Sequence, residues 1–67
     1  MADAIVTAVE SRLTQLGQYN GPGDGMYGPL VRDAVADYQI AHGLKVSGSL
    51  SPETLQSLGI EIDNDAN

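Results

Sequence analysis

The chain has 67 residues, no cysteine, one histidine, and nine acidic against three basic residues, which gives a formal net charge of −6. This length allows one small domain with a marginal core, since a chain of this size buries only about 60% of its unfolded surface. The lack of cysteine excludes disulfides and Cys-based zinc sites, and the acidic balance excludes nucleic acid, whose binding requires Lys and Arg to neutralise phosphates. Hydrophobic residues make up 42% of the chain, which is enough for a folded domain.

The N-terminal sequence shows no targeting or membrane segment. Asp3 stands where a secretory signal would carry a base, and no apolar run approaches the roughly 20 residues of a membrane span. Three scattered bases do not form a polybasic membrane patch. We therefore expect a soluble chain with no membrane partner, which is either made in the cytoplasm or is a mature or excised domain whose leader has been removed.

The first predicted helix lies between Asp3 and Gly17. Its apolar residues recur at helical spacing on one face: Ile5, Val9, Leu13 and Leu16. Asp3 can cap the start of this helix, and Gly17 can end it.

The second predicted helix begins at Pro29, which is favoured at the first helical position because its missing N–H would be unpaired there anyway. Its apolar residues are again spaced as on one helix face: Leu30, Val31, Ala34, Val35 and Tyr38. Gly43 ends the helix, and Leu44 is the apolar residue that a Schellman cap tends to recruit.

The third predicted helix is short, with Ser51 as its N-cap, Pro52 at its first position and Gly59 at its end. Leu55 and Leu58 are expected to point inward. The chain then continues with acidic and amide residues that have nothing to bury. We expect residues 1–60 to form the domain and residues 61–67 to form an acidic, disordered tail.

The two glycine-rich connections repeat each other at an offset of 23 residues. Residues 25–31 (GMYGPLV) match residues 48–54 (GSLSPET), so that Gly25 pairs with Gly48 and Pro29 with Pro52. Each copy is a glycine turn, one inward apolar residue and a helix started by Pro. Two copies are too few for a solenoid. The sequence therefore predicts an all-α fold, a small three-helix domain in which a pseudo-symmetric loop–helix pair packs against the first helix.

The glycine-rich segment 23–28 (GDGMYG) has the spelling of a dinucleotide-binding loop, but a helix and a turn precede it where that motif requires a β-strand. A calcium loop counted from Asn20 would place Pro22 and Val31 at ligand positions, which breaks the pattern. We expect the glycines to serve tight turns and Asp24 to hydrogen-bond its own turn. No metal or cofactor is predicted.

The polar residues of the second helix do not form a recognisable catalytic motif. Asp33 and Asp37 alternate with the apolar stripe, as a solvated face does, and His42 follows in the last turn, where it can meet the helix dipole. No strand–turn–helix elbow surrounds the nearby serines. We predict that the chain is not an enzyme, because so small a core can hardly hold a preorganised pocket.

Gln39 is the most informative polar residue of the second helix. Its side chain either hydrogen-bonds backbone groups of a nearby loop or faces a ligand. The first role is favoured, because most side-chain hydrogen bonds are made to backbone or water.

The sequence resembles the small three-helix peptidoglycan-binding domain found on bacterial and phage cell-wall hydrolases. The residues that carry this resemblance span most of the chain: Val9, Leu13, Leu16-Gly17, Tyr19, Asn20-Gly21, Asp24 to Pro29, Ala34-Val35, Tyr38-Gln39, Gly43-Leu44, Gly48, Pro52, Thr54 and Leu55. The sequence departs from the family pattern at three positions, where Gln, Thr and Asp are usual: Glu10, Val31 and Ser47. We expect these positions to serve caps and turns, so the departures concern ligand recognition more than fold.

The resemblance implies a non-catalytic module that attaches to peptidoglycan or a muropeptide through a shallow groove beside the second helix. Tyr27 and Tyr38 could stack on sugar faces or pack against peptide methyl groups. Gln39 and Asp24 could offer hydrogen bonds to the ligand. Arg32, the one base near the motif, is our own candidate for binding a stem-peptide carboxylate.

A second hypothesis is a protein-interaction or adaptor module built on the same scaffold. The expected fold is also similar to that of the amino-terminal prodomain of matrix metalloproteases, which inhibits through a cysteine that is lacking here. Fold alone does not fix function. We expect a monomer in either case. Wall binding implies action at the bacterial cell wall beside a fused or associated hydrolase, whereas an adaptor without wall binding would act in the cytoplasm.

Overall fold

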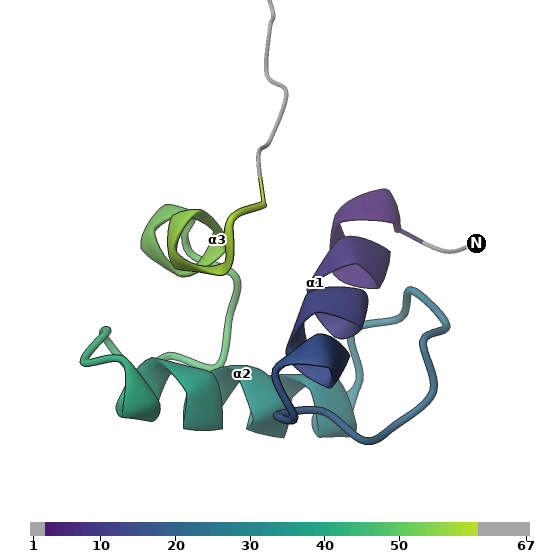
Figure 1. Cartoon of the computed structure of the whole chain (residues 1–67), viewed down its shortest axis with the longest axis horizontal. Helices are drawn as coiled ribbons and strands as arrows, with labels where there is room; N and C mark the ends of the chain where they lie inside the picture. Colours follow the sequence, from purple (N-terminus) through teal and green to yellow (C-terminus); the bar gives the residue numbers. More distant parts are fainter. Residues whose placement is uncertain (1–2, 61–67) are drawn as a thin grey trace, which may run out of the picture.

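The computed structural model describes residues 3–60 and contains three helices and no strand in that range. They are α1 (Ala4–Gln15), α2 (Pro29–Ala41) and α3 (Pro52–Leu58). Figure 1 shows α1 and α3 on the same side of α2, with α1 toward the N-terminal end of α2 and α3 toward its C-terminal end. The predicted all-α fold is confirmed. The expected tail, residues 61–67, lies outside the described residues.

The helices begin where their capping residues predict. The Oδ1 atom of Asp3 accepts two backbone N–H groups in the first turn of α1, at 2.9 and 3.2 Å. At the start of α3, the Oγ atom of Ser51 accepts the N–H of Thr54 at 3.3 Å. Helix α2 begins with Pro29 after Gly28, which has no side chain to cap it. Each side-chain cap stabilises its helix by about 1 kcal/mol.

The C-terminus of α2 adopts the predicted Schellman-type cap. Leu44 donates its N–H to the carbonyl of Gln39 at 2.8 Å, and Gly43 donates to the carbonyl of Ile40 at 3.3 Å. The side chain of Leu44 packs against the core. The cap therefore turns the chain back toward α3.

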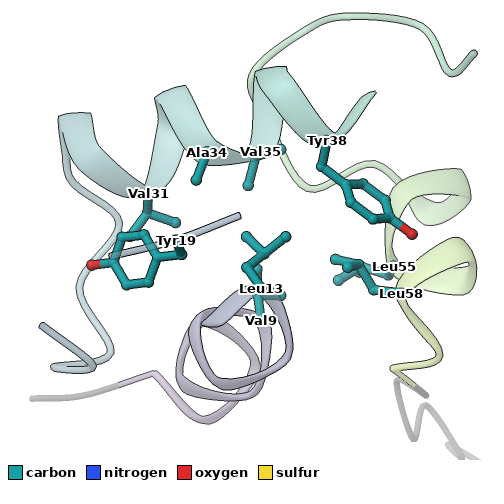
Figure 2. Packing of buried hydrophobic residues seen from close by; sticks show 9 residues of the cluster. All are labelled: Val9, Leu13, Tyr19, Val31, Ala34, Val35, Tyr38, Leu55 and Leu58. Carbon is teal, nitrogen blue, oxygen red and sulfur yellow. The ribbon is translucent and has the colours of Figure 1, made fainter. Parts of the chain in front are cut away.

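The core lies between the three helices (Figure 2). Val9 and Leu13 of α1 point toward α2, while the ring of Tyr38 reaches from α2 to α3. Burying each large apolar side chain contributes about 1.5–3 kcal/mol. The buried cluster comprises Val9, Leu13, Tyr19, Val31, Ala34, Val35, Tyr38, Leu55 and Leu58.

Two leucines that follow the helical spacing of the predicted apolar faces are exposed. Leu16 is 44% exposed, because α1 ends at Gln15 and Leu16 is its C-cap, after which the chain turns away. Leu30 is 60% exposed. One residue corresponds to roughly 100° of rotation on a helix, so an inward Val31 leaves Leu30 at the edge of the apolar face. Neither side chain therefore belongs to the core, although both follow the helical spacing.

The predicted repeat is present in the backbone. Gly25 and Gly48 have φ angles of 73° and 72°, in the left-handed region that favours glycine. Pro29 and Pro52 each occupy the first positions of their helices. Within residues 3–60, no helix has the length and apolar character needed to cross a membrane.

Candidate functional site

Gln39 is fully buried, and its amide group fastens the loop between α2 and α3. Its Oε1 atom accepts the N–H groups of Ser47 at 2.9 Å and Gly48 at 3.0 Å. Its Nε2 atom donates to the carbonyl of Ser49 at 3.1 Å and to Oγ1 of Thr54 at 2.9 Å. With 0% of Gln39 exposed, the amide leaves no surface for a ligand. The structure thus gives Gln39 the backbone-binding role.

Tyr38, another predicted ligand contact, also lies inside the fold. It is 3% exposed, and its hydroxyl is 2.7 Å from Oγ of Ser57 on α3. Its ring stacks on the ring of His42, with 4.0 Å between the centroids. His42 is the C-cap of α2, and its Nδ1 atom lies 3.0 Å from the carbonyl of Tyr38. Tyr38 therefore joins α2 to α3 rather than facing a groove.

Glu10 holds the first glycine turn as Gln39 holds the second. Its Oε1 atom accepts the N–H of Gly25 at 2.8 Å, and the side chain is 1% exposed. The Oε2 atom is buried without a hydrogen-bond partner among the described residues. At the repeat position of Thr54 stands Val31, which has no hydroxyl group. In the second turn, the amide of Gln39 and the hydroxyl of Thr54 satisfy each other's hydrogen bonds. The first turn lacks such a pair.

Rebuilding this pair in the first turn should stabilise the domain. We expect the double variant Glu10→Gln, Val31→Thr to raise the free energy of unfolding by about 1–2 kcal/mol, because it removes a buried carboxylate oxygen without a partner and supplies a hydroxyl for the new amide. Urea denaturation measures the change. Glu53→Gln on the exposed face of α3 is the matched control, expected to change stability by less than about 0.5 kcal/mol. An unchanged or lower midpoint for the double variant would show that a Gln–Thr pair does not stabilise the first turn as it does the second.

Tyr27 and Arg32 meet at Gly48. The hydroxyl of Tyr27 donates to the carbonyl of Gly48, and a Cβ placed on Gly48 would lie 3.0 Å from Cγ of Arg32. Burial raises the pKa of Tyr27, and the charge of Arg32 opposes that shift. Tyr27 is 38% exposed and Arg32 is also exposed. The structure therefore brings these two predicted site residues together at the surface.

Asp24 lies apart from that pair, in the loop between α1 and α2. Its Oδ1 atom accepts the N–H of Met26 at 3.0 Å, which confirms the predicted hydrogen bond within its own turn. Asp24 and Met26 are both exposed. Figure 1 shows this loop running back alongside α1 before it reaches the start of α2.

Two adjoining hollows lie between this loop and α2, along residues 29–37 of the helix. The first has a volume of about 260 Å³, and its lining includes Asp24, Met26 and Leu30. The second has a volume of about 350 Å³, and its lining includes Asp37. Tyr19 and Leu30 border both hollows, so we treat the two as one surface and call it the loop–α2 groove.

Two further hollows differ from this groove in their lining. A hollow of about 490 Å³ between α1 and α3 includes Arg12 and extends to Ile60, the last described residue. A hollow of about 240 Å³ is bordered by Lys45 and Glu53. Of these hollows, the loop–α2 groove is the one whose lining includes large, exposed apolar side chains. Within residues 3–60, no group of three or more His, Asp or Glu side chains is placed to hold a metal ion.

Sequence reasoning missed Met26 and Leu30 as candidate ligand contacts. A helical projection could have found Leu30, because it lies at the margin of the apolar face that Val31 occupies. No local pattern of this kind marks Met26, because the N–H of Gly28 donates to the carbonyl of Met26 at 3.0 Å. The backbone therefore turns tightly at Tyr27, and side chains in such a turn do not alternate as they do in a strand.

Comparisons with known proteins agree with this architecture. A family model described as "Putative peptidoglycan binding domain" matches residues 2–58. Localization factor PodJL of Caulobacter vibrioides is 42% identical over 59 residues, which cover 88% of this chain and 6% of PodJL. N-acetylmuramoyl-L-alanine amidase CwlM of Mycobacterium tuberculosis is 42% identical over 53 residues, which cover 79% of this chain and 13% of CwlM. No solved structure matches.

The chain thus corresponds to a small part of each of these relatives. The family match covers all three helices and both glycine turns. It confirms the resemblance seen in the sequence: the chain belongs to the peptidoglycan-binding domain family.

Proposed function

We propose that this domain attaches to bacterial cell-wall peptidoglycan as a non-catalytic module, and that the loop–α2 groove is the surface that makes the contact. Family membership supports peptidoglycan as the general ligand. The observation that carries the choice of surface is the pair of exposed apolar side chains in the groove, Met26 at 61% and Leu30 at 60%. Exposed apolar groups around a concave surface are typical of ligand sites.

The groove and its neighbourhood offer three kinds of contact to a wall fragment. Met26 and Leu30 can pack against peptide methyl groups, and Asp24 can accept hydrogen bonds at the edge of the same hollow. The half-exposed ring of Tyr27 can pack on a sugar face. The guanidinium group of Arg32, beside that ring, can bind a carboxylate in a bidentate manner. Tyr38 and Gln39 are both buried and offer no surface to a ligand.

Sedimentation with purified sacculi at low salt tests this proposal, with Leu30→Ser and Ile40→Ser as a matched pair. Both residues lie on α2 and are similarly exposed, at 60% and 64%, but only Leu30 is part of the groove lining. We expect Leu30→Ser to weaken binding about fivefold, the loss of roughly 1 kcal/mol of apolar contact, and Ile40→Ser to bind like the unmodified protein.

Two results would count against the proposal in different ways. Unmodified protein that stays in the supernatant would refute wall binding. Equal sedimentation of Leu30→Ser and Ile40→Ser would leave wall binding intact and place it on another surface.

A protein-binding module is the second candidate. The relative that carries a matching segment in Caulobacter is described as a localization factor. An apolar groove beside a helix can also hold a peptide segment of a partner. This function would hold instead if the domain ignored sacculi yet retained one defined protein, with an affinity that Leu30→Ser reduces and Ile40→Ser does not.

A further inference from the structure

Charges are distributed unevenly around the loop–α2 groove. Asp24 borders one of its hollows and Asp37 borders the other. None of the three basic residues of the chain is part of the lining of either hollow. Arg12 bonds to the C-terminal end of α3, Arg32 lies against the loop between α2 and α3, and Lys45 belongs to that loop. The lining of the groove therefore carries negative charge without a compensating base.

A third carboxyl group lies behind the loop that forms one wall of the groove. Glu10 reaches from α1 to the N–H of Gly25, and its second oxygen has no partner among the described residues. Burial raises the pKa of Tyr19, which borders both hollows, and the charges of Glu10 and Asp24 raise it further. The hydroxyl of Tyr19 donates to the carbonyl of Pro22 at 2.6 Å, so it is already engaged within the loop.

We propose, building on the wall-binding function above, that the loop–α2 groove recognises the free ammonium group of a diamino acid in a wall peptide. The methylene chain of such a residue would pack against Met26 and Leu30, and its ammonium group would lie beside Asp24, with Asp37 adding to the attraction. Long cationic side chains commonly bury their apolar stem while the charged head stays at a polar edge. A carboxylate in the same place would be repelled.

The test compares two soluble probes: a disaccharide–tetrapeptide whose diamino acid has a free side-chain amine, and the same compound with that amine acetylated. Acetylation removes the positive charge and leaves the glycan and the carboxylates unchanged. Titration by calorimetry at low salt gives both affinities. We expect the free amine to bind about two- to fivefold more tightly, the range of a solvent-accessible ion pair.

Asp24→Asn and Asp33→Asn form the matched pair of variants. Both change the net charge by one, and Asn at position 24 can still accept the N–H of Met26 that Asp24 accepts at 3.0 Å. Asp33 is an exposed residue of α2 outside the groove lining. We expect Asp24→Asn to abolish the preference for the free amine and Asp33→Asn to keep it.

The outcomes separate this inference from the function on which it rests. If the unmodified protein binds both probes equally, amine recognition is wrong and wall binding stands. If it binds neither probe, both proposals fail. If Asp33→Asn loses the preference as fully as Asp24→Asn does, net charge rather than the groove causes it, and the inference is again wrong.

Discussion

Gln39→Ala is expected to lower the free energy of unfolding by about 3 kcal/mol or more. The substitution leaves the buried N–H group of Gly48 and the partly buried N–H group of Ser47 without an acceptor, and a buried group without a partner costs about 1–3 kcal/mol. A core of this size rarely supplies more than about 3–5 kcal/mol in total. Chemical denaturation followed by circular dichroism should therefore show a largely unfolded chain or a midpoint close to zero denaturant.

Two further variants show whether the hydrogen bonds of Gln39 are the cause. Gln56→Ala, at an exposed position of α3, should leave the midpoint almost unchanged. Gln39→Glu keeps the shape and the acceptor oxygen but cannot donate to Ser49 and Thr54, so it should also destabilise the domain strongly. If Gln39→Ala and Gln56→Ala had the same denaturation midpoint, the side-chain amide of Gln39 would not be what holds the loop.

Tyr38→Ala should be comparably damaging, with a loss of about 3–5 kcal/mol, because it empties the space between α2 and α3. Tyr38→Phe keeps the ring and loses only the hydrogen bond to Ser57, which should cost about 1 kcal/mol. Thermal melts of the two variants measure the difference.

Ligand affinity provides the complementary readout for Tyr38. Because the hydroxyl group faces Ser57 inside the fold, Tyr38→Phe should bind sacculi as well as the unmodified domain does. Weaker binding by Tyr38→Phe together with an unchanged melting temperature would instead assign Tyr38 to the ligand site.

The local structure of this domain follows from short-range signals in the sequence. Asp3 and Ser51 cap their helices through N–H groups two or three residues away, and Leu44 closes α2 five residues from its partner Gln39. Such contacts depend on neighbouring residues alone, so the positions of caps and helices can be predicted without knowing the tertiary fold. The repeat is predictable for the same reason, since glycine and proline mark its turns.

The candidate site depends on contacts that no local pattern contains. The bond between Glu10 and Gly25 spans 15 residues, and it forms only when the loop folds back on α1. The groove likewise requires that loop to lie beside α2, with Leu30 at its margin. For this reason the sequence identified Asp24 and its turn and favoured the backbone-binding role of Gln39, but it missed the apolar side chains next to Asp24.

A chemical-shift map of the ¹⁵N-labelled domain, titrated with a soluble muropeptide, tests the central claim most directly. If the loop–α2 groove binds peptidoglycan, the largest amide shifts should cluster at residues 19–31 and extend to Asp37. The amide signals of residues around Arg12 and Ile60, in the hollow between α1 and α3, should not shift. Shifts concentrated between α1 and α3, or no shifts at saturating muropeptide, would contradict the claim.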